Sequence, residues 1–387
     1  MKLSSRVLQL KPSLTLAITS KAKALKKSGV DVISFGAGEP DFDTPSHIKE
    51  AAIESIRSGF TKYTEASGTL ELKSAICDQL RSNNGLEYTT DQVVVSCGAK
   101  HALYNIFQVL CDRTDEVIVI SPYWVSYPEM VHLSGAVARV VESKEEDGYI
   151  VDPGLLKKNI TKRTKAIIIN SPSNPTGAVY DKAVLENIAD LAVSKKVFVI
   201  SDEIYEALTY DGVKQVSIAS LGKDIYDRTI TVNGVSKSYS MTGWRIGYAA
   251  GPKDMIEKIG ALQSHSTSNP TSISQKAALC ALKGDQAVIG RMRAEFVSRR
   301  DYMVRVINSI KGMSCFTPKG AFYVFCNIEK TGLGSVALCE RLLDDVHVAC
   351  VPGAAFGSDK HIRLSFATGM ENISKGLTRI GDWFKRL

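Results

Sequence analysis

The sequence of 387 residues lacks several features that would indicate a membrane or nucleic-acid partner. No apolar run approaches the roughly 18 residues that a spanning helix needs. Pro12 interrupts the only apolar portion of the N-terminus, so we expect no signal peptide. The net charge is +7, but no block of five or more basic residues occurs, which argues against nucleic-acid binding. We therefore expect a cytoplasmic protein with neither a membrane nor a nucleic acid as partner.

The spacings by which proteins bind metal ions are also missing. The eight cysteines include no CxxC pair, and the six histidines include no HExxH motif. Most of the cysteines lie in apolar runs, which is typical of free thiols in a reducing compartment. We expect neither a metal ion nor a disulfide. The composition, 44% hydrophobic and 23% charged, is that of an ordinary globular protein, long enough for two or three structural units.

Apolar, β-branched runs recur through the centre of the chain and predict strands. They lie at 92–96, 116–120, 166–169, 197–200, 229–232 and 246–249. Helical patterns, for example at 100–110 and 182–194, separate most of these runs. Continuous apolar strands joined by helices predict the α/β class, with a mainly parallel sheet that helices cover on both faces.

The C-terminal part of the chain has a different pattern, which predicts a smaller α+β unit. An amphipathic stretch at 286–310 predicts a long helix, strands are expected at 321–327 and 361–366, and a closing helix is expected from Ser374. We expect three parts in all. They are an N-terminal arm at 1–45 that packs on the small domain, a large domain at 46–285 and a small domain at 286–387.

Chemically useful side chains follow the predicted strands, and ligands of open α/β sheets bind beyond the carboxyl ends of the strands. The first predicted strand is followed by a helix start and the second by an aromatic ring. The third is followed by an amide, the fourth by a carboxylate and the fifth by an amine. These residues are Gly98, Ala99 and Lys100, then Trp124, Asn174, Asp202 with Tyr205, and Ser236 with Lys237. Each alone is a weak indication, whereas the ordered set predicts one site.

Most of these residues also have a purely structural interpretation. Gly98 could serve tight strand–helix packing, or the helix that it opens could hold a phosphate with its free N–H groups. Asp202 could cap a helix, or it could keep a heteroaromatic nitrogen protonated. Trp124 could belong to the core, and Asn174 could form a turn before Pro175.

Lys237 decides between these interpretations, because it follows a buried strand where a charged amine is costly to desolvate. Desolvation lowers the pKa of a lysine and makes its amine a nucleophile. Arg245 could be a surface charge, but it stands between Trp244 and an apolar run, which favours a buried anionic partner. An activated amine, a phosphate-type helix start, a carboxylate and a ring together predict a pyridoxal phosphate site, with the cofactor held on Lys237 as a Schiff base.

Eight segments also carry a resemblance to a known family. They are AGEPDFDTP (37–45), GAKHALYN (98–105), SPYWVSYPEM (121–130), NSPSNPTGAVY (170–180), SDEIYE (201–206), SKSYSMTGWRIGY (236–248), GAFY (320–323) and HIRLSFA (361–367). In this order they resemble the class I aminotransferases of fold type I, and especially the bacterial aspartate aminotransferase subgroup. The resemblance implies a large domain with a mainly parallel seven-stranded sheet and a smaller α+β domain.

The resemblance implies catalytic roles for the matching residues. Lys237 would hold pyridoxal phosphate and move a proton between the substrate Cα and the cofactor, while Asp202 would pair with the pyridinium nitrogen. Tyr205 and Asn174 would hydrogen-bond the phenolic oxygen. Trp124 would stack on the ring, on the face opposite Ile204, and Trp124 and Asn174 would also contact the substrate.

The resemblance places a further group of residues around the phosphate, namely Gly98, Ala99, Lys100, Ser236 and Arg245. Tyr63 would reach the phosphate of the neighbouring subunit, which implies a homodimer with shared active sites. Gly234 is a departure, because many relatives carry a phosphate-binding hydroxyl three residues before the lysine. We therefore expect fewer phosphate contacts at position 234, so that Arg245 and the helix start would supply more of the hydrogen bonds to the phosphate.

The substrate contacts follow from the same resemblance. Arg363 would hold the α-carboxylate in a bidentate fork, and the backbone of Gly38 would contact the same group. The subgroup implies Ser13, Thr15 and Lys100 around a distal carboxylate, although the two hydroxyl groups could equally cap a helix. We expect amino transfer from aspartate to 2-oxoglutarate in two half-reactions at one site.

Two other activities stay open at this point. The enzyme could be an aminotransferase of broader range that also accepts prephenate or aromatic amino acids, since Lys11 lies in the segment associated with prephenate. A pyridoxal phosphate-dependent lyase of the same fold would share Lys237, Asp202 and Arg363.

Overall fold

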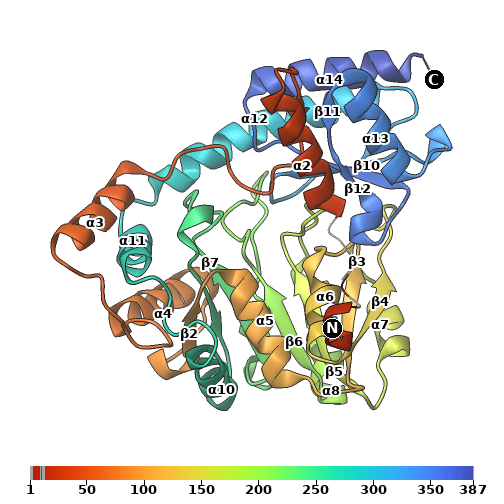
Figure 1. The fold of residues 1–387 in the computed structure, drawn as a ribbon. Helices are drawn as coiled ribbons and strands as arrows, with labels where there is room; N and C mark the ends of the chain where they lie inside the picture. The colour runs from red at the N-terminus through yellow and green to blue at the C-terminus, as the bar shows by residue number, and fades with distance from the viewer. Residues whose placement is uncertain (1–2, 9, 11–13, 387) are drawn as a thin grey trace.

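The computed structural model describes residues 3–8, 10 and 14–386, and it has two parts, each built on a β-sheet (Figure 1). The larger part holds a seven-stranded sheet in the order β2-β8-β7-β6-β5-β3-β4. Its strands are β2 (Val93–Ser96), β3 (Glu116–Ser121), β4 (Val137–Glu142), β5 (Thr164–Asn170), β6 (Phe198–Asp202), β7 (Thr229–Gly234) and β8 (Gly247–Ala250). Strand β8 alone runs opposite in direction to the other six strands, so the predicted mainly parallel α/β sheet is confirmed.

Strand β4 is the one strand of this sheet that no apolar run predicted. It lies at the edge of the sheet, where it pairs only with β3. Its Val137 and Val140 are 52% and 48% exposed, and Arg139 lies between them. With only one of its six residues buried, β4 lacks the continuous apolar pattern of the other strands of the sheet.

Helices cover both faces of the large sheet because successive side chains of a strand point to opposite faces. One face packs against α5 (Ala99–Leu110), α6 (Ser126–Leu133) and α10 (Lys253–Ser264). The other packs against α7 (Pro153–Asn159), α8 (Lys182–Lys195) and α9 (Lys223–Tyr226). Strands β2 and β8 pack against α3 (Ser46–Arg57), α4 (Leu70–Asn84) and α11 (Ser272–Lys283).

The smaller part is built on a four-stranded antiparallel sheet in the order β12-β13-β10-β9. Its strands are β9 (Ser314–Cys315), β10 (Tyr323–Asn327), β12 (Val351–Pro352) and β13 (His361–Ser365). Helices α12 (Ala287–Ser309), α13 (Ser335–Val346) and α14 (Met370–Phe384) accompany it. The predicted long helix and both predicted strands are present, and the closing helix begins four residues before Ser374.

Helix α2 (Leu14–Lys27) and strand β1 (Ile33–Ser34) of the N-terminal segment lie against this smaller part, whereas the short helix α1 (Ser5–Leu8) contacts α6 of the larger part. Strand β1 pairs in parallel with β11 (Val348–Ala349). Figure 1 shows α2 beside α13 in the upper part of the view, where Lys21 of α2 pairs with Asp344 of α13. The chain then crosses toward α3, and this crossing brings residues near 38 to the junction of the two parts.

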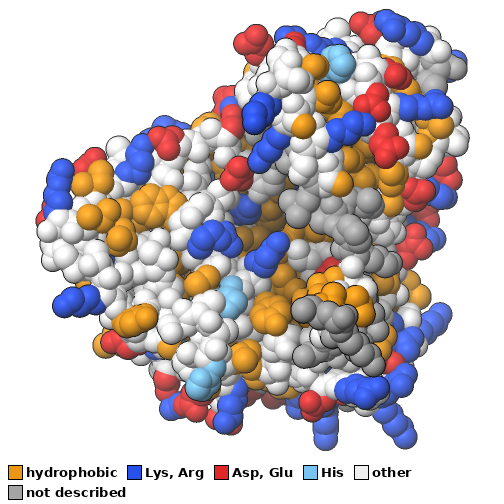
Figure 2. Space-filling model, viewed as in Figure 1, with side chains coloured by type: hydrophobic (Ala, Val, Ile, Leu, Met, Phe, Trp, Pro, Cys, Tyr) orange, Lys and Arg blue, Asp and Glu red, His pale blue; other side chains and the backbone are white. Residues whose placement is uncertain are grey.

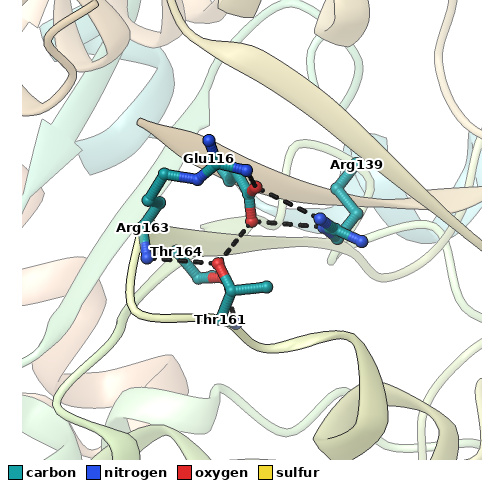
Figure 3. A network of polar contacts seen from close by, with 5 residues as sticks. All are labelled: Glu116, Arg139, Thr161, Arg163 and Thr164. Atoms are coloured by element: carbon teal, nitrogen blue, oxygen red, sulfur yellow. Dashed lines mark hydrogen bonds and ion pairs between the residues drawn. The ribbon is translucent and has the colours of Figure 1, made fainter. Parts of the chain in front are cut away.

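A network of polar contacts lies at the amino end of strand β3, at the opposite end of the large sheet from the carboxyl ends that carry the predicted site residues (Figure 3). The Glu116 carboxylate, which is buried at the start of β3, accepts hydrogen bonds from Arg139, Arg163 and Thr161 at 2.6–3.2 Å. The bonds from Arg139 contribute most to lowering the pKa of Glu116, to about 2, against the burial that raises it. This carboxylate ties β3 to its two neighbouring strands.

In the described part of the chain, no helix is both long and apolar enough to cross a membrane. Among the same residues, no group of three or more histidine, cysteine or acidic side chains could hold a metal ion. All eight cysteines are free.

Candidate active site

A cavity of about 420 Å³ lies between the carboxyl ends of the large sheet and the smaller sheet. In Figure 2 this face of the molecule is hollowed between the two parts, and basic side chains lie at the hollow. The residues that line it include nearly all those predicted from the strand ends and from the resemblance, namely Gly38, Ala99, Lys100, Trp124, Asn174, Asp202, Tyr205, Ser236, Lys237, Arg245 and Arg363. The fold therefore brings these residues together from β5, β6, β7, β13 and the start of α5.

Lys237 enters the cavity from the turn after β7. Every residue of β7 is buried, so the strand itself offers no exposed position for an amine. Lys237 instead follows the strand, at the carboxyl end of the sheet. The Nζ atom donates a hydrogen bond of 2.6 Å to the carbonyl oxygen of Gly38. Burial lowers the pKa of Lys237 to about 8, which gives the amine a substantial neutral fraction near physiological pH.

Asp202 ends β6 with its carboxylate at the cavity. Its Oδ2 atom accepts a hydrogen bond of 2.5 Å from the hydroxyl of Tyr127, and its Oδ1 atom accepts one of 3.3 Å from the amide of Ile204. Burial raises the pKa of Asp202 to about 6, while these two hydrogen bonds and the charge of Lys237 oppose that shift. A cationic group placed beside this carboxylate would be held strongly, because little water screens it.

Tyr127 is a site residue that sequence reasoning missed. Its hydroxyl reaches Asp202 from α6, and its ring packs edge-on against Trp124, with 5.3 Å between the ring centroids. The sequence feature that could have identified Tyr127 is its spacing of three residues from Trp124, about one turn of a helix. That spacing alone does not distinguish a core tyrosine from one that contacts a carboxylate.

Arg363 reaches the cavity from β13 in the smaller sheet. Its Nη1 atom donates to Oδ1 of Asn174 at 2.9 Å, and its Nη2 atom donates to the carbonyl oxygen of Gly36 at 3.2 Å. The guanidinium lies over the ring of Tyr323 at 4.3 Å and over that of Phe356 at 5.0 Å. Its Nε atom is buried and has no partner among the described residues, so an anion could still satisfy this donor.

Tyr205 and Tyr323 join the two sheets at the floor of the cavity. Their hydroxyl groups share a hydrogen bond of 2.9 Å. Tyr323 belongs to the matched segment GAFY but was not among the predicted site residues. Its hydroxyl lies 3.7 Å from the position that a Cβ atom would take on Gly38, which is ordinary van der Waals contact.

The start of α5 supports a site for an anion. The first N–H groups of a helix have no partner within the helix, and α5 begins with Ala99 and Lys100 at the cavity. Arg245 lies beside them, held through Nη1 by the carbonyl oxygen of Thr242 at 2.7 Å and through Nη2 by that of Cys97 at 3.3 Å. The helix start and the guanidinium therefore present several donors to one region.

Gly98 makes this close approach possible. Its φ is +88°, in the left-handed region that favours glycine, and a Cβ atom there would lie 2.3 Å from Nη2 of Arg245. The tight packing considered for Gly98 is therefore present, and it brings the guanidinium to the helix start, where a phosphate was predicted. Lys100 lies near Trp124, with Nζ 4.9 Å from the ring, and burial together with the charge of Arg245 lowers its pKa.

The structure explains the departure at Gly234. A Cβ atom at this position would lie 2.8 Å from the Cα atom of Gly247 and 2.9 Å from the carbonyl oxygen of Ile246. The close pairing of β7 with β8 therefore leaves no room for a hydroxyl-bearing side chain unless the strands move apart.

Of the other predicted residues, Gly98 does not itself line the cavity but stands directly before Ala99, which does. Tyr63 is 89% exposed and does not line the cavity. Ser13 lies outside the described residues. Thr15 is in α2, but its side chain also lies outside what the structure describes, so the expected contacts of both hydroxyl groups stay predictions.

Comparisons with known proteins agree with this geometry. The family described as aminotransferase class I and II matches residues 30–380. A curated aspartate aminotransferase of Geobacillus stearothermophilus is 49% identical over 387 residues, which cover 98% of each chain. An aspartate/prephenate aminotransferase of Thermus thermophilus is 46% identical over 380 residues, which cover 97% of each. The solved structure of an aspartate aminotransferase from Thermus thermophilus with maleate has a TM-score of 0.95 at 45% identity, covering 99% of each chain.

Proposed function

The chain belongs to the class I and II aminotransferases, and on this premise we propose that it transfers the amino group of L-aspartate to 2-oxoglutarate, with pyridoxal phosphate as cofactor. The products would be oxaloacetate and L-glutamate. The observation that carries this proposal is the convergence of an amine, a carboxylate and two guanidinium groups in one cavity, from Lys237, Asp202, Arg245 and Arg363. A lyase would need the same groups, but the relatives are named as aminotransferases.

The residues around the cavity fit pyridoxal phosphate. Asp202 offers a buried carboxylate to a ring nitrogen, and the start of α5 with Arg245 offers donors to a phosphate. Ser236 also lines the cavity, Gly98 lets Arg245 approach the helix start closely, and Trp124 provides a flat surface for a ring. When bound, the cofactor supplies an aldehyde that takes up the amino group and a ring that stores the electrons left at Cα.

Within this proposal, the chain's own groups handle the proton and orient the reactants. The amine of Lys237 would take the proton from the substrate Cα and pass it to the cofactor, which its lowered pKa permits near neutral pH. Asp202 would hold the ring nitrogen in its protonated form, and Tyr205 and Asn174 would donate to the phenolic oxygen. Two half-reactions at one site imply that the first product leaves before the second substrate binds.

Arg363 and Lys100 would distinguish the two ends of a dicarboxylic substrate. The unpartnered Nε atom of Arg363 suits a carboxylate, and the backbone of Gly38 lies beside the amine of Lys237. Lys100 is the cation for a distal carboxylate, helped by the hydroxyl groups of Ser13 and Thr15. Support comes from the Thermus thermophilus relative that was solved with maleate, which is itself a dicarboxylate.

We also propose a cytoplasmic homodimer in which Tyr63 reaches the partner's phosphate site. Its ring is 89% exposed, and Ile56 and Leu70 nearby in the sequence are 55% and 63% exposed. Exposed apolar side chains of this size favour a protein partner. Each chain would then divide near residues 45 and 285 into arm, large domain and small domain.

The decisive experiment is an assay of oxaloacetate formation from aspartate and 2-oxoglutarate by the purified holoenzyme and by its Lys237→Ala variant. We expect activity in the first and its loss in the second, together with loss of the near-visible absorbance of the bound cofactor. Borohydride reduction should label the peptide that contains Lys237. Equal activity of the two proteins, or label on a different lysine, would contradict the proposal.

A second candidate activity is the amination of prephenate. It is favoured by the name of the Thermus thermophilus relative, an aspartate/prephenate aminotransferase. Lys11, on which the sequence argument for this activity depends, lies outside the described residues. Formation of arogenate from prephenate and an amino donor would establish it, and its absence at high enzyme concentration would remove it.

A further inference from the structure

Residues 36–45, which we call the 36–45 strap, run from β1 past the mouth of the cavity to α3. The strap is attached at several points to elements that are distant in sequence. The carboxylate of Asp41 forms an ion pair of 2.7 Å with Arg299 on α12. The hydroxyl of Thr44 donates a hydrogen bond of 2.7 Å to the carbonyl oxygen of Ser240. The strap is therefore held between the smaller part and the loop that follows Lys237.

The middle of the strap contacts the predicted catalytic groups. The carbonyl oxygen of Gly38 accepts the 2.6 Å hydrogen bond from Nζ of Lys237. The next residue, Glu39, accepts a hydrogen bond of 2.7 Å at Oε2 from the hydroxyl of Thr242. Thr242 in turn holds Arg245 through its carbonyl oxygen. Glu39 thus follows Gly38, which contacts Lys237, directly in the chain. Glu39 is also hydrogen-bonded to Thr242, which holds Arg245.

The charges around Lys237 show what the carboxylate contributes. Arg245 after η3 (Thr242–Trp244) and Arg363 on β13 both lower the pKa of the amine, in addition to the larger effect of burial. Asp202 on β6 and Glu39 on the strap raise it, and of these two carboxylates Glu39 has the greater effect. The rings of Tyr205 and Phe322, at 5.9 and 5.8 Å from Nζ, also face the amine.

We propose that Glu39 is a positioning residue for the transamination reaction. Held by the hydroxyl of Thr242, its carboxylate keeps the Gly38 carbonyl on Nζ of Lys237 and offsets the positive charge that two arginines place beside this amine. The inference rests on the proposed role of Lys237 in holding the cofactor. Glu39 is exposed, so water screens its charge and its electrostatic effect is modest.

The electrostatic part of the proposal is tested by Glu39→Gln, which keeps the shape of the side chain and removes its charge. The measured quantity is the pH midpoint of the near-visible absorbance of the holoenzyme, which reports the cationic group at Lys237. Because a nearby anion favours the cation, we expect the midpoint to fall by about 0.5 unit. Asp43→Asn is the matched control, since Asp43 lies on the same strap but pairs with Lys49 at 2.5 Å, and its midpoint should equal that of the parent.

The mechanical part is tested by Thr242→Val, which keeps the charge of Glu39 but removes its tether. A loosened strap displaces Gly38, so we expect the KM for aspartate to rise about fivefold, with a smaller shift of the midpoint than in Glu39→Gln. Thr242→Ser restores the hydroxyl and should recover at least half of that loss. Thermal unfolding midpoints of all variants establish that they are folded. If Glu39→Gln proves unfolded, the comparison of Thr242→Val with Thr242→Ser still tests the proposal.

Two outcomes would overturn the proposal. One is the same midpoint in Glu39→Gln and Asp43→Asn, and the other is an equal KM in the valine and serine variants at position 242. Failure of the proposed function looks different, because Lys237→Ala would then keep the near-visible absorbance. An unshifted Glu39→Gln enzyme alongside a colourless Lys237→Ala protein would remove the role of Glu39 alone.

Discussion

The hydroxyl of Tyr127 donates a hydrogen bond of 2.5 Å to the carboxylate of Asp202, and both groups are buried beneath the cavity. Burial raises the pKa of this carboxyl to about 6, and the tyrosine opposes that shift. The tyrosine on α6 therefore helps to keep the carboxylate ionised, which is the form needed to hold a protonated ring nitrogen.

Tyr127→Phe should raise the pKa of Asp202 because it removes the strongest of the influences that lower it. We expect the acidic limb of the kcat/KM profile to move to higher pH by about 0.5 to 1 unit, with lower activity at neutral pH. The measurement is a pH profile for aspartate. Tyr302→Phe is the control, because that hydroxyl contacts Ser374 in the smaller part. Superimposable profiles for the parent and Tyr127→Phe would contradict the argument.

Gly98→Ala should weaken cofactor binding, because its Cβ atom would meet the guanidinium of Arg245 at 2.3 Å. Gly85→Ala is the matched control, since Gly85 also has a positive φ, +67°, but its Cβ atom would meet nothing within 4 Å. Both variants should lose about 1 kcal/mol of stability from backbone strain. Only Gly98→Ala should raise the Kd for pyridoxal phosphate, by about tenfold or more if one charged hydrogen bond is lost. A titration of the apoenzyme measures this, and equal Kd values would exclude a phosphate at the start of α5.

Lys100→Ala should affect the dicarboxylic substrate selectively. We expect the KM for aspartate to rise about tenfold, while that for phenylalanine changes much less, because only aspartate has a distal carboxylate. Lys100→Met separates charge from packing, since it keeps an unbranched side chain beside Trp124. Steady-state kinetics with both amino acids test this prediction. Equal effects on the two substrates would remove Lys100 from the specificity argument.

Glu116→Gln should destabilise the fold without acting at the cavity. The charged hydrogen bonds to Arg139 and Arg163 are weakened, so we expect a loss of about 2 kcal/mol in the free energy of unfolding at pH 7. The pKa of Glu116 is about 2 in the folded protein, below its ordinary value of about 4.3 when unfolded. Its contribution is therefore complete above about pH 4.3 and declines as the pH falls toward 2.

Urea unfolding at several pH values measures this difference. The gap between parent and Glu116→Gln should narrow below pH 4.3. Glu87→Gln is the control, because its partner Arg81 and Glu87 itself are exposed, and such surface pairs contribute about 1 kcal/mol or less. A gap that stays constant down to pH 2 would show that the charge of Glu116 is not what stabilises the sheet.

The central strands were predictable because each buries both faces and so has an apolar run of its own. The edge strand β4 was not, since only one of its six residues is buried and the charged residues Arg139 and Glu142 stand beside its apolar ones. Strand ends were informative in the same way, because a polar residue directly after a buried strand must lie at the edge of the sheet. That reasoning located Asn174, Asp202 and Lys237 at one cavity.

The sequence by itself determined the order of strands and helices, the family, and which polar residues end the buried strands, because these depend on local patterns and matched segments. The tertiary structure decided the partners: Tyr127 for Asp202, Asn174 for Arg363 across 189 positions, and Thr242 for Glu39 across 203. Periodicity tells which face of an element is buried but not which distant side chain meets it. That choice is made only when helix, strap and both sheets pack together.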